Sequence, residues 1–366
     1  MTARPDPAAL AAALPPAFRL GAATSEPQIE GAAGRGTSGW DAFAERDGAI
    51  LDGSDFSIAA DSVHRWREDV ALAGDLGLDR YRFSISWTRV QPDGTGAANA
   101  AGLDYYSRLV DGLLEAGVTP FPTLFHWDMP VPLNEAGGWR SRDTAARFAD
   151  YTALVADRLG DRVKHWYTIN EPAMTTLQGY ATGELAPGEI LIFDALPTAH
   201  HQLLAHGLAM PVLRERGAEA VGLANNHTHV RPLRADDPAD VAAVAAYDLI
   251  HNRIFADPIL TGEYPDMSAY DRSMPVRDGD MALMRDHRIR IVVAKNAGGE
   301  GARAKLDADA RTRAAAVEFI GQAMARAAEL ANPGVFGQGA EELVERDVVL
   351  ASFGVHFSAA ISSPSA

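Results

Sequence analysis

Six short apolar runs alternate along this chain with longer segments of helical spacing, and this alternation limits the fold more than any other feature. The runs occupy residues 18–23, 81–86, 118–125, 163–169, 221–225 and 289–294. They are apolar on both faces, which is typical of buried parallel strands. Helices are predicted over residues 103–116, 148–159 and 194–216, and a glycine follows each of them. Strand and helix in alternation predict a parallel sheet with right-handed crossovers.

Polar residues at the ends of these runs distinguish a barrel from an open sheet. They include Ser84 and Ser86, His126 and Asp128, Asn170 and Glu171, and residues 225–229. Functional residues at the carboxyl ends of many strands are typical of a (β/α)8 barrel. An open doubly wound sheet concentrates its site at one switch point, usually with a glycine-rich phosphate turn, and no such turn follows any of the runs. The sequence therefore predicts an α/β fold of the (β/α)8 TIM-barrel type.

Composition excludes several classes of partner and site. The chain has 49 Asp and Glu against 33 Lys and Arg, a formal charge of −16 that repels nucleic acid. It has no cysteine, so it has no disulfide, thiolate zinc site or cysteine nucleophile. No run approaches the roughly 20 apolar residues of a membrane span, and residues 8–14 resemble a signal peptide poorly. We expect a cytoplasmic protein with no membrane partner.

The strongest chemical signal is Glu171, which ends an apolar run directly before Pro172. Burial at a barrel mouth, beside Tyr167 and Trp166, would raise the pKa of this carboxyl group, as a general acid at neutral pH requires. Its neighbour Asn170 offers both a donor and acceptors. The alternative interpretation is a carboxylate that stabilises the start of a helix through the helix dipole.

Two further strand ends carry groups suited to a sugar. His126 and Trp127 offer an imidazole beside an indole platform, which fits a ring with hydroxyl groups and an apolar face. Gln28 follows the first run and could bind two adjacent hydroxyl groups. Each alone is better explained as an ordinary buried histidine or a loop glutamine, but together on successive strands they favour a binding site.

Several stretches resemble glycoside hydrolase family 1, the β-glucosidase family of (β/α)8 barrels. They are Phe-Arg-Leu-Gly-Ala-Ala-Thr-Ser-Glu-Pro-Gln-Ile-Glu-Gly (residues 18–31), Tyr-Arg-Phe-Ser-Ile-Ser-Trp (81–87), Thr-Leu-Phe-His-Trp-Asp (123–128), Gly-Gly-Trp (137–139), Thr-Ile-Asn-Glu-Pro (168–172), Ala-Pro-Gly (186–188) and, more weakly, residues 257–265. The resemblance covers about residues 17–285 in family order. It implies a single barrel domain over residues 1–366, in which residues 286–366 are shortened and divergent. Whether strands 6–8 are complete stays open.

The resemblance also implies roles for individual residues. Glu171 is similar to the family's general acid/base, and Asn170 to the residue that binds the sugar 2-hydroxyl. Gln28 and His126 are similar to groups that hold the sugar, and Arg82 to the arginine that orients the nucleophile. The implied reaction is retaining hydrolysis of a small β-glucoside or related β-glycoside, with no cofactor and no metal.

The second carboxylate of that mechanism does not follow from the motifs. The family's Thr-Glu-Asn-Gly element corresponds best to residues 291–298, which place Lys295 at the position of the nucleophile. Glu300, five residues further, is an alternative acid, although a solvated loop charge is the better interpretation of it. Pro27 also departs from the family, which usually has an aromatic residue there. A catalytically impaired pseudo-glycosidase that binds sugar or serves as a scaffold is therefore the alternative function.

Other interpretations rest on single features. His227 and His229 would share one face of an extended segment, as in metal-dependent barrel hydrolases. Their position in a stretch similar to a family binding loop makes a metal site the weaker interpretation. Residues 312–331 are expected to form a helix and residues 348–355 a last strand. The sequence does not indicate the oligomeric state.

Overall fold

The described strands form one parallel sheet whose order follows the sequence. The computed structural model describes residues 18–270, 273–285 and 292–293. Within these ranges the strand order is β1-β2-β3-β4-β5-β6. Their bounds are β1 Gly21–Ala23, β2 Arg80–Ser84, β3 Thr119–Phe125, β4 His165–Asn170, β5 Ala220–Ala224 and β6 Val292–Val293. Each strand overlaps one of the six predicted runs, so these predictions are confirmed.

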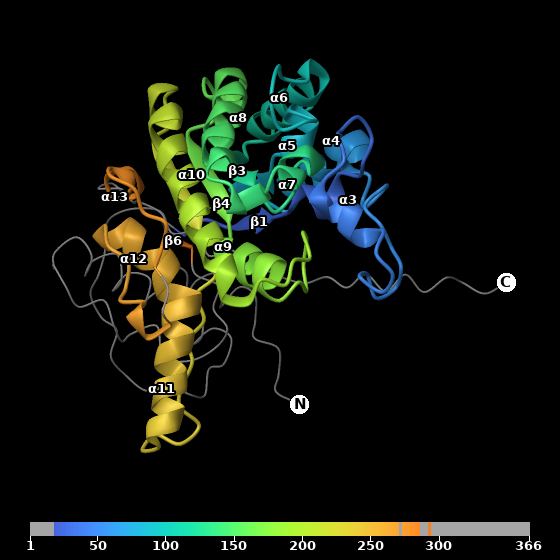
Figure 1. Cartoon of the computed structure of the whole chain (residues 1–366). Coiled ribbons are helices and arrows are strands. Elements are labelled where there is room, and N and C mark those ends of the chain that lie inside the picture. Colours follow the sequence, from blue (N-terminus) through green and yellow to red (C-terminus); the bar gives the residue numbers. More distant parts are fainter. Residues whose placement is uncertain (1–17, 271–272, 286–291, 294–366) are drawn as a thin grey trace, which may run out of the picture.

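Helices connect consecutive strands (Figure 1). The α-helices are α2 Glu26–Ile29, α3 Gly39–Ala44, α4 Ser62–Asp75, α5 Trp87–Val90, α6 Ala100–Glu115, α7 Val131–Glu135, α8 Asp143–Leu159, α9 Pro172–Met174, α10 Leu196–Glu215, α11 Pro238–Tyr247, α12 Ile254–Thr261 and α13 Asp280–Met284. Short 3-10 turns are η1 Gly138–Arg140, η3 Ile192–Ala195 and η5 Ser268–Tyr270, and π-helical segments are η2 Thr175–Ala181 and η4 Asp248–Arg253. The three predicted helices correspond to α6, α8 and α10. Among the described helices, none combines the length and apolar character needed to cross a membrane.

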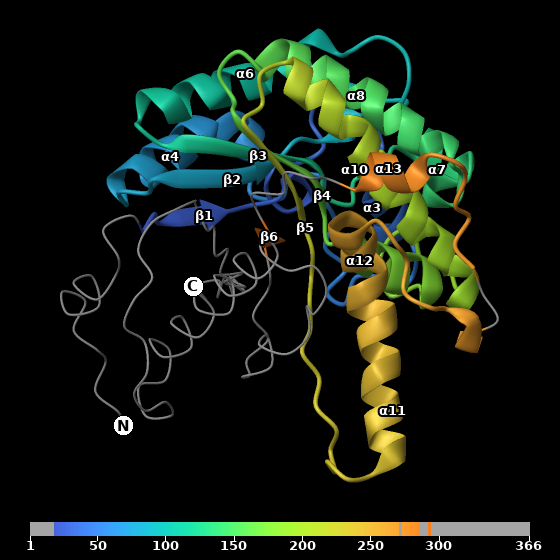
Figure 2. The ribbon, with the colours of Figure 1, turned by 90° about the vertical axis from the view of Figure 1, so that its left-hand side faces the viewer.

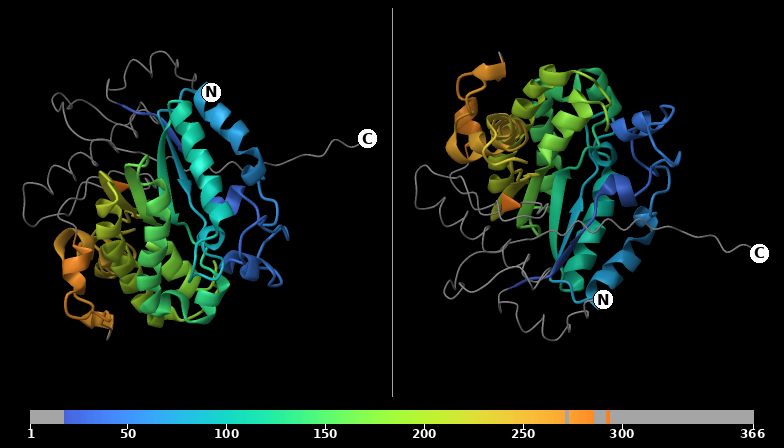
Figure 3. Two further views of the ribbon diagram at one scale, coloured as in Figure 1. Left: turned by 90° about the horizontal axis from the view of Figure 1, so that it is seen from above. Right: turned by 90° about the horizontal axis from the view of Figure 1, so that it is seen from below.

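The strand order supports a barrel and not a doubly wound sheet. In a doubly wound sheet the order reverses at a switch point and helices cover both faces. Here the order never reverses, and α4, α6, α8 and α10 follow one another in an arc along one face of the sheet (Figures 2 and 3). This is the arrangement of a (β/α)8 barrel over the part of the chain that the structure describes. The predicted helix at 312–331 and strand at 348–355 lie outside the described residues.

Strand β3 keeps its place in the sheet although it contains Pro120 and Pro122, which have no backbone N–H to donate. Thr119 N donates to Asp79 O and Ile85 N donates to Thr123 O, so these odd-numbered positions bond toward β2. By alternation the two prolines turn their backbone toward β4. Pairing with β4 accordingly begins at Thr123, beyond the second proline. The prolines thus leave the ladder with β4 confined to the carboxyl end of the strand.

Tyr151 of α8 fastens the helix layer to the carboxyl end of the sheet. Its buried hydroxyl lies 3.0 Å from both Ile85 O and Leu124 O, and therefore joins the ends of β2 and β3. Its ring stacks on Trp87, with ring centroids 5.0 Å apart, and both side chains are fully buried. The core thereby fixes the strand ends that carry the candidate site. By contrast, α11 buries none of its residues and projects from the remainder of the molecule (Figure 1).

Candidate active site

Asn170 stands at the centre of a hydrogen-bond network that joins the ends of three neighbouring strands. Arg82 Nη2 on β2 donates to Asn170 Oδ1 at 2.7 Å. The Asn170 Nδ2 atom lies 3.1 Å from His126 Nε2, just beyond β3, and the backbone carbonyl of Asn170 accepts from Trp127 Nε1 at 2.8 Å. Arg82 is itself fixed by a 2.9 Å bond from Nε to Thr123 Oγ1. The structure therefore brings together Arg82, His126 and Asn170, three of the residues to which the resemblance assigns site roles.

The backbone around Glu171 is shaped by a bulge and a left-handed turn. The pairing of β4 with β5 shifts register between Tyr167 and Asn170, so β4 has one extra residue there. Glu171 N continues the pairing to Ala224 O at 2.7 Å, and Glu171 then adopts φ 44° and ψ 63°. Pro172 disfavours the right-handed helical region for the residue before it. Bulges redirect side chains beside active sites, and this one precedes the predicted acid/base.

Trp127, at the end of β3, is another of the five described non-glycine residues with positive φ, and its φ is 78°. Left-handed conformations of such residues cost of order 1–3 kcal/mol each and cluster at functional sites. Glu171 and Trp127 therefore place two strained positions at the carboxyl ends of adjacent strands. This coincidence supports the location of the site independently of the hydrogen bonds.

Burial sets the charge state of the polar network. Burial lowers the pKa of His126 well below its usual value, and the positive charge of Arg82 lowers it further, so the imidazole is neutral. The oxygen of the Asn170 amide accepts from Arg82 Nη2, so the amide nitrogen faces His126. The amide nitrogen therefore donates, and His126 Nε2 accepts. Burial also lowers the pKa of Arg82, while the charges of Tyr167 and Glu171 act in the opposite direction. Glu171 is thus close enough to Arg82 to interact with it electrostatically.

An aromatic group stands beside this network. Trp40 stacks on Trp127 with ring centroids 6.5 Å apart and an interplanar angle of 28°, and it contacts Phe56 at 5.5 Å. The ring of His126 lies 5.2 Å from that of Trp127. Sequence reasoning missed Trp40 and Phe56, because they lie on the connection between β1 and β2, far from any strand end. The local sequence signal near Trp40 is the capping box of Ser38 and Asp41, which indicates the start of helix α3 but not the position of Trp40 beside the site.

Gln28 lies beyond β1 in α2 and is exposed. Its Oε1 atom accepts a 2.7 Å hydrogen bond from Ser25, within its own turn. Gln28 is therefore at the predicted edge of the sheet, although its hydrogen bond to Ser25 is local. Lys295 and Glu300 lie outside the described residues, so their roles stay predictions. The preceding strand β6 pairs directly with β5, through Leu223 and Val292.

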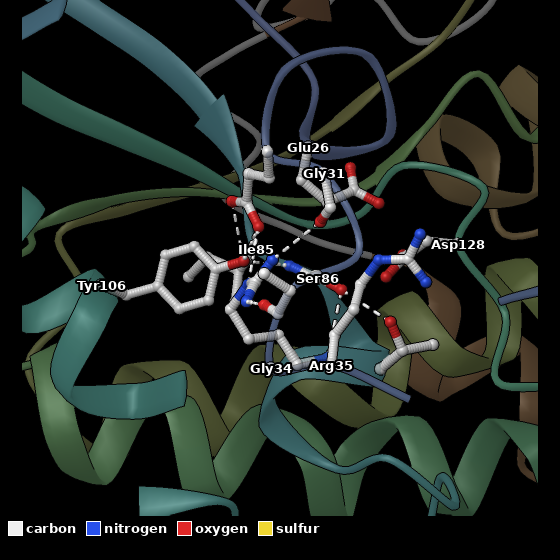
Figure 4. Close-up of polar contacts among 12 residues, drawn as sticks. Glu26, Gly31, Gly34, Arg35, Ile85, Ser86, Tyr106 and Asp128 are labelled. Atoms are coloured by element: carbon white, nitrogen blue, oxygen red, sulfur yellow. Dashed lines mark hydrogen bonds and ion pairs between the residues drawn. The ribbon is translucent and has the colours of Figure 1, made fainter. Parts of the chain in front are cut away.

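A buried ion pair holds the connection that follows Gln28. Arg89 Nε lies 2.8 Å from Glu30 Oε2, and only 3% and 4% of these two side chains are exposed. Tyr106 donates to the same carboxylate at 2.9 Å and 3.0 Å, while Arg89 also donates to the carbonyls of Gly31 and Ala33 (Figure 4). Burial raises the pKa of Glu30, and Arg89 opposes that rise. Glu30, Arg89 and Tyr106 therefore stabilise this connection.

The histidines after β5 are arranged differently from a metal site. Burial lowers the pKa of His227 to about 4, and Asn252 is its hydrogen-bond partner. Thr228 Oγ1 lies 3.2 Å from His251 Nε2, while His229 Nε2 accepts from Arg231 at 3.4 Å. Across the described ranges, no group of three or more His, Cys, Asp or Glu side chains could hold a metal ion.

Comparison with known proteins relates this geometry to one family. The sequence pattern of glycosyl hydrolase family 1 matches residues 10–294, more than half of the chain. A 1,4-beta-D-glucan glucohydrolase of Thermotoga neapolitana is 40% identical over 257 residues, which are 69% of this chain and 60% of that protein.

Two solved structures are similar to the described fold. The psychrophilic beta-glucosidase BglU of Micrococcus antarcticus has a TM-score of 0.74 and 46% identity, covering 77% of this chain and 61% of that one. Virulence factor SghA of Agrobacterium tumefaciens, solved with its substrate analog salicin, has a TM-score of 0.76 and 38% identity, covering 80% and 66%. The chain thus spans about 60% of the length of the relatives that it matches. The chain belongs to glycosyl hydrolase family 1.

Proposed function

We propose that this chain acts on β-glucosides or related small β-glycosides, with Glu171 as the general acid and base of a retaining hydrolysis. The observation that carries the proposal is the position of Glu171, which directly follows the Arg82–Asn170–His126 network at the carboxyl end of β4. In the first step Glu171 would protonate the leaving oxygen. In the second it would take a proton from the water that releases the sugar.

The remaining residues of the network suit the sugar ring. His126 and Asn170 would bind hydroxyl groups, and the indole of Trp127 would contact an apolar face of the ring. Arg82 donates to the Asn170 amide and would orient both this amide and the attacking carboxylate. That second carboxylate is assigned to no described residue. Glu26, Glu30 and Asp128 are buried, and each accepts a hydrogen bond from another group of the protein.

The relatives support a glucoside as the substrate class. Two of them carry glucohydrolase or beta-glucosidase in their names, and SghA was solved with salicin as a substrate analog. These names favour hydrolysis over a pseudo-glycosidase that only binds sugar. A small sugar substrate also agrees with the negative charge of the chain, which disfavours anionic polymers.

The proposal is tested with two β-glucosides that differ in their leaving groups. Wild type and Glu171→Gln are assayed on a nitrophenyl β-glucoside, whose leaving group departs with little protonation, and on an alkyl β-glucoside, which requires it. General acid catalysis contributes about 10²–10⁴-fold. We therefore expect Glu171→Gln to lose kcat/KM of this order on the alkyl glucoside and much less on the nitrophenyl glucoside, because kcat/KM reports the first step and not the later release of the sugar. Glu184→Gln, at an exposed glutamate in the following connection, is the matched control.

The outcomes separate the two functions. Equal losses of kcat/KM on the two glucosides, or no loss, would remove Glu171 from the role of acid. The anomer first released, observed by proton NMR, tests retention, because inversion would require a water between the two carboxyl groups. If wild-type protein forms no product but glucose raises its melting temperature, the result would indicate the sugar-binding function.

A further inference from the structure

Two buried carboxyl groups meet behind the candidate active site. Glu26 is 4% exposed and Asp128 is 2% exposed, and their carboxyl groups lie within hydrogen-bonding reach of each other. Ser84 donates to Glu26 Oε2 at 2.5 Å, and the backbone N–H of Trp87 donates to Asp128 Oδ2 at 2.7 Å. The other oxygen of each group, Glu26 Oε1 and Asp128 Oδ1, is buried without a donor among the described residues.

Two ionised carboxylates cannot remain side by side at such a place. Each would be an acceptor facing an acceptor, and buried like charges repel strongly. A single proton between them turns the repulsion into a hydrogen bond and satisfies both leftover oxygens. Asp128 accepts hydrogen bonds from the Trp87 backbone N–H and from the Ser86 hydroxyl. Asp128 is therefore the better site for the negative charge, and Glu26 is the better site for the proton.

The groups around the pair leave it with one negative charge. Arg35 extends toward Asp128 (Figure 4) and is itself paired with Asp41. Glu30, the nearest further carboxylate, is balanced by Arg89. Burial raises the pKa of Glu26 well above its usual value, with Asp128 as the next cause, and burial raises that of Asp128 to about 7. One proton on the pair is therefore retained at neutral pH.

We propose that Glu26 is a positioning residue, which shares one proton with Asp128 and thereby ties the segment that carries Gln28 to the segment that carries His126 and Trp127. Glu26 lies in the same helical turn as Gln28, in α2. Asp128 lies two residues beyond His126. The shared proton links these two segments directly through their side chains, and its loss would weaken the link between them. The consequence for sugar binding rests on the proposed function, whereas the shared proton does not.

The test compares wild type with Glu26→Gln and Glu26→Ala, with Glu115→Gln as a control at an exposed glutamate of α6. The glutamine amide donates to Asp128 at every pH, whereas alanine donates nothing. Infrared spectra at pH 7 are expected to show the carbonyl band of a protonated carboxylic acid in wild type and Glu115→Gln, and to lack it in Glu26→Gln. Absence of the band in wild type, or its persistence in Glu26→Gln, overturns the proposal.

Unfolding and binding give the second readout. The folded pair keeps a proton that the unfolded chain loses above about pH 4.5, so wild-type stability falls relative to Glu26→Gln as the pH rises from there until the pair releases its proton. The dissociation constant of a neutral thio-β-glucoside, which resists hydrolysis, is expected to rise about tenfold in wild type as the pair loses its proton, the equivalent of one lost hydrogen bond. The dissociation constant is expected to be independent of pH in Glu26→Gln and to be high at every pH in Glu26→Ala.

The outcomes are distinguishable from failure of the proposed function. Identical pH dependence in wild type and Glu26→Gln overturns the positioning role. If no variant binds the thioglucoside, the proposed function fails, while the infrared band and the pH dependence of unfolding still decide whether the proton is shared.

Discussion

Removal of Arg89 is expected to destabilise the fold more than any loss of an exposed ion pair. Among the described residues, the Arg89→Met variant leaves the buried Glu30 carboxylate with the Tyr106 hydroxyl as its donor, and it removes the Arg89 donors to the carbonyls of Gly31 and Ala33. Breaking a buried pair by removing one partner costs about 3–5 kcal/mol. A domain with about 5–15 kcal/mol of stability would lose a large share of it and still fold.

The partner variant separates charge from packing. Glu30→Gln keeps an oxygen that accepts from Arg89 but leaves the guanidinium, which cannot lose its charge, buried without its counter-ion, so its cost should also be about 3–5 kcal/mol. The double variant Glu30→Gln/Arg89→Met should cost less than the sum of the single changes. Both charges of the pair are absent from it, so no charge is left buried without a partner. Urea unfolding followed by circular dichroism measures each free energy from the midpoint and slope.

The matched control is Arg65→Met, since Arg65 pairs with Glu68 on the surface, where the side chains are 59% and 64% exposed. Exposed pairs contribute little and are screened by salt. We expect almost no change in the unfolding midpoint for this control. Equal midpoints for Arg65→Met and Arg89→Met, or strictly additive single costs, would refute the reasoning from burial.

Three further expectations concern single side chains. Tyr151→Phe removes the hydroxyl that joins the carboxyl ends of β2 and β3 and should cost about 1–3 kcal/mol in urea unfolding, with the slope unchanged; a cost near zero would mean that the carbonyls find other donors. Asn170→Ala frees Arg82 Nη2 and should weaken thio-β-glucoside binding at least tenfold by calorimetry, so unaltered affinity would place the sugar elsewhere. Burial lowers the pKa of His200 to about 4, so the folded chain binds fewer protons than the unfolded chain between about pH 6.5 and 4 and stability falls on acidification through this range. His200→Gln should flatten this slope in pH-dependent thermal unfolding, whereas an unchanged slope would assign it to other groups.

The strands could be predicted because each one is short and apolar on both faces. The end of β4 was the clearest case, since Pro172 marks where the ladder stops and leaves Asn170 and Glu171 at the edge. The bulge before Asn170 was not predictable, because it arises from pairing with β5, some 50 residues further along the chain. Helix α4 was also missed, because only three of its residues are buried and its apolar stripe is weak.

The hydrogen-bond network was predicted in its members and not in its geometry. Arg82, His126 and Asn170 could be selected by their motifs, but the central position of Asn170 depends on three strands that meet in space. Glu26 passed unnoticed, because a glutamate in a loop is expected to be exposed. Its burial is caused by Ser84 and Asp128, which lie 58 and about 100 residues away. Trp40 was missed because it lies between β1 and β2, whereas the Trp127 ring on which it stacks follows β3.

The unreversed strand order has a consequence for how the protein is made. Each strand pairs with the one synthesised immediately before it, as Tyr81 of β2 pairs with Ala22 of β1 and then with Pro120 of β3. A chain leaving the ribosome can therefore add one strand and one helix at a time to an existing template, and each addition closes only one crossover loop. Synonymous slow codons between these units would lengthen the pauses in which a unit docks, and relocating them into the units should lower the yield of native protein.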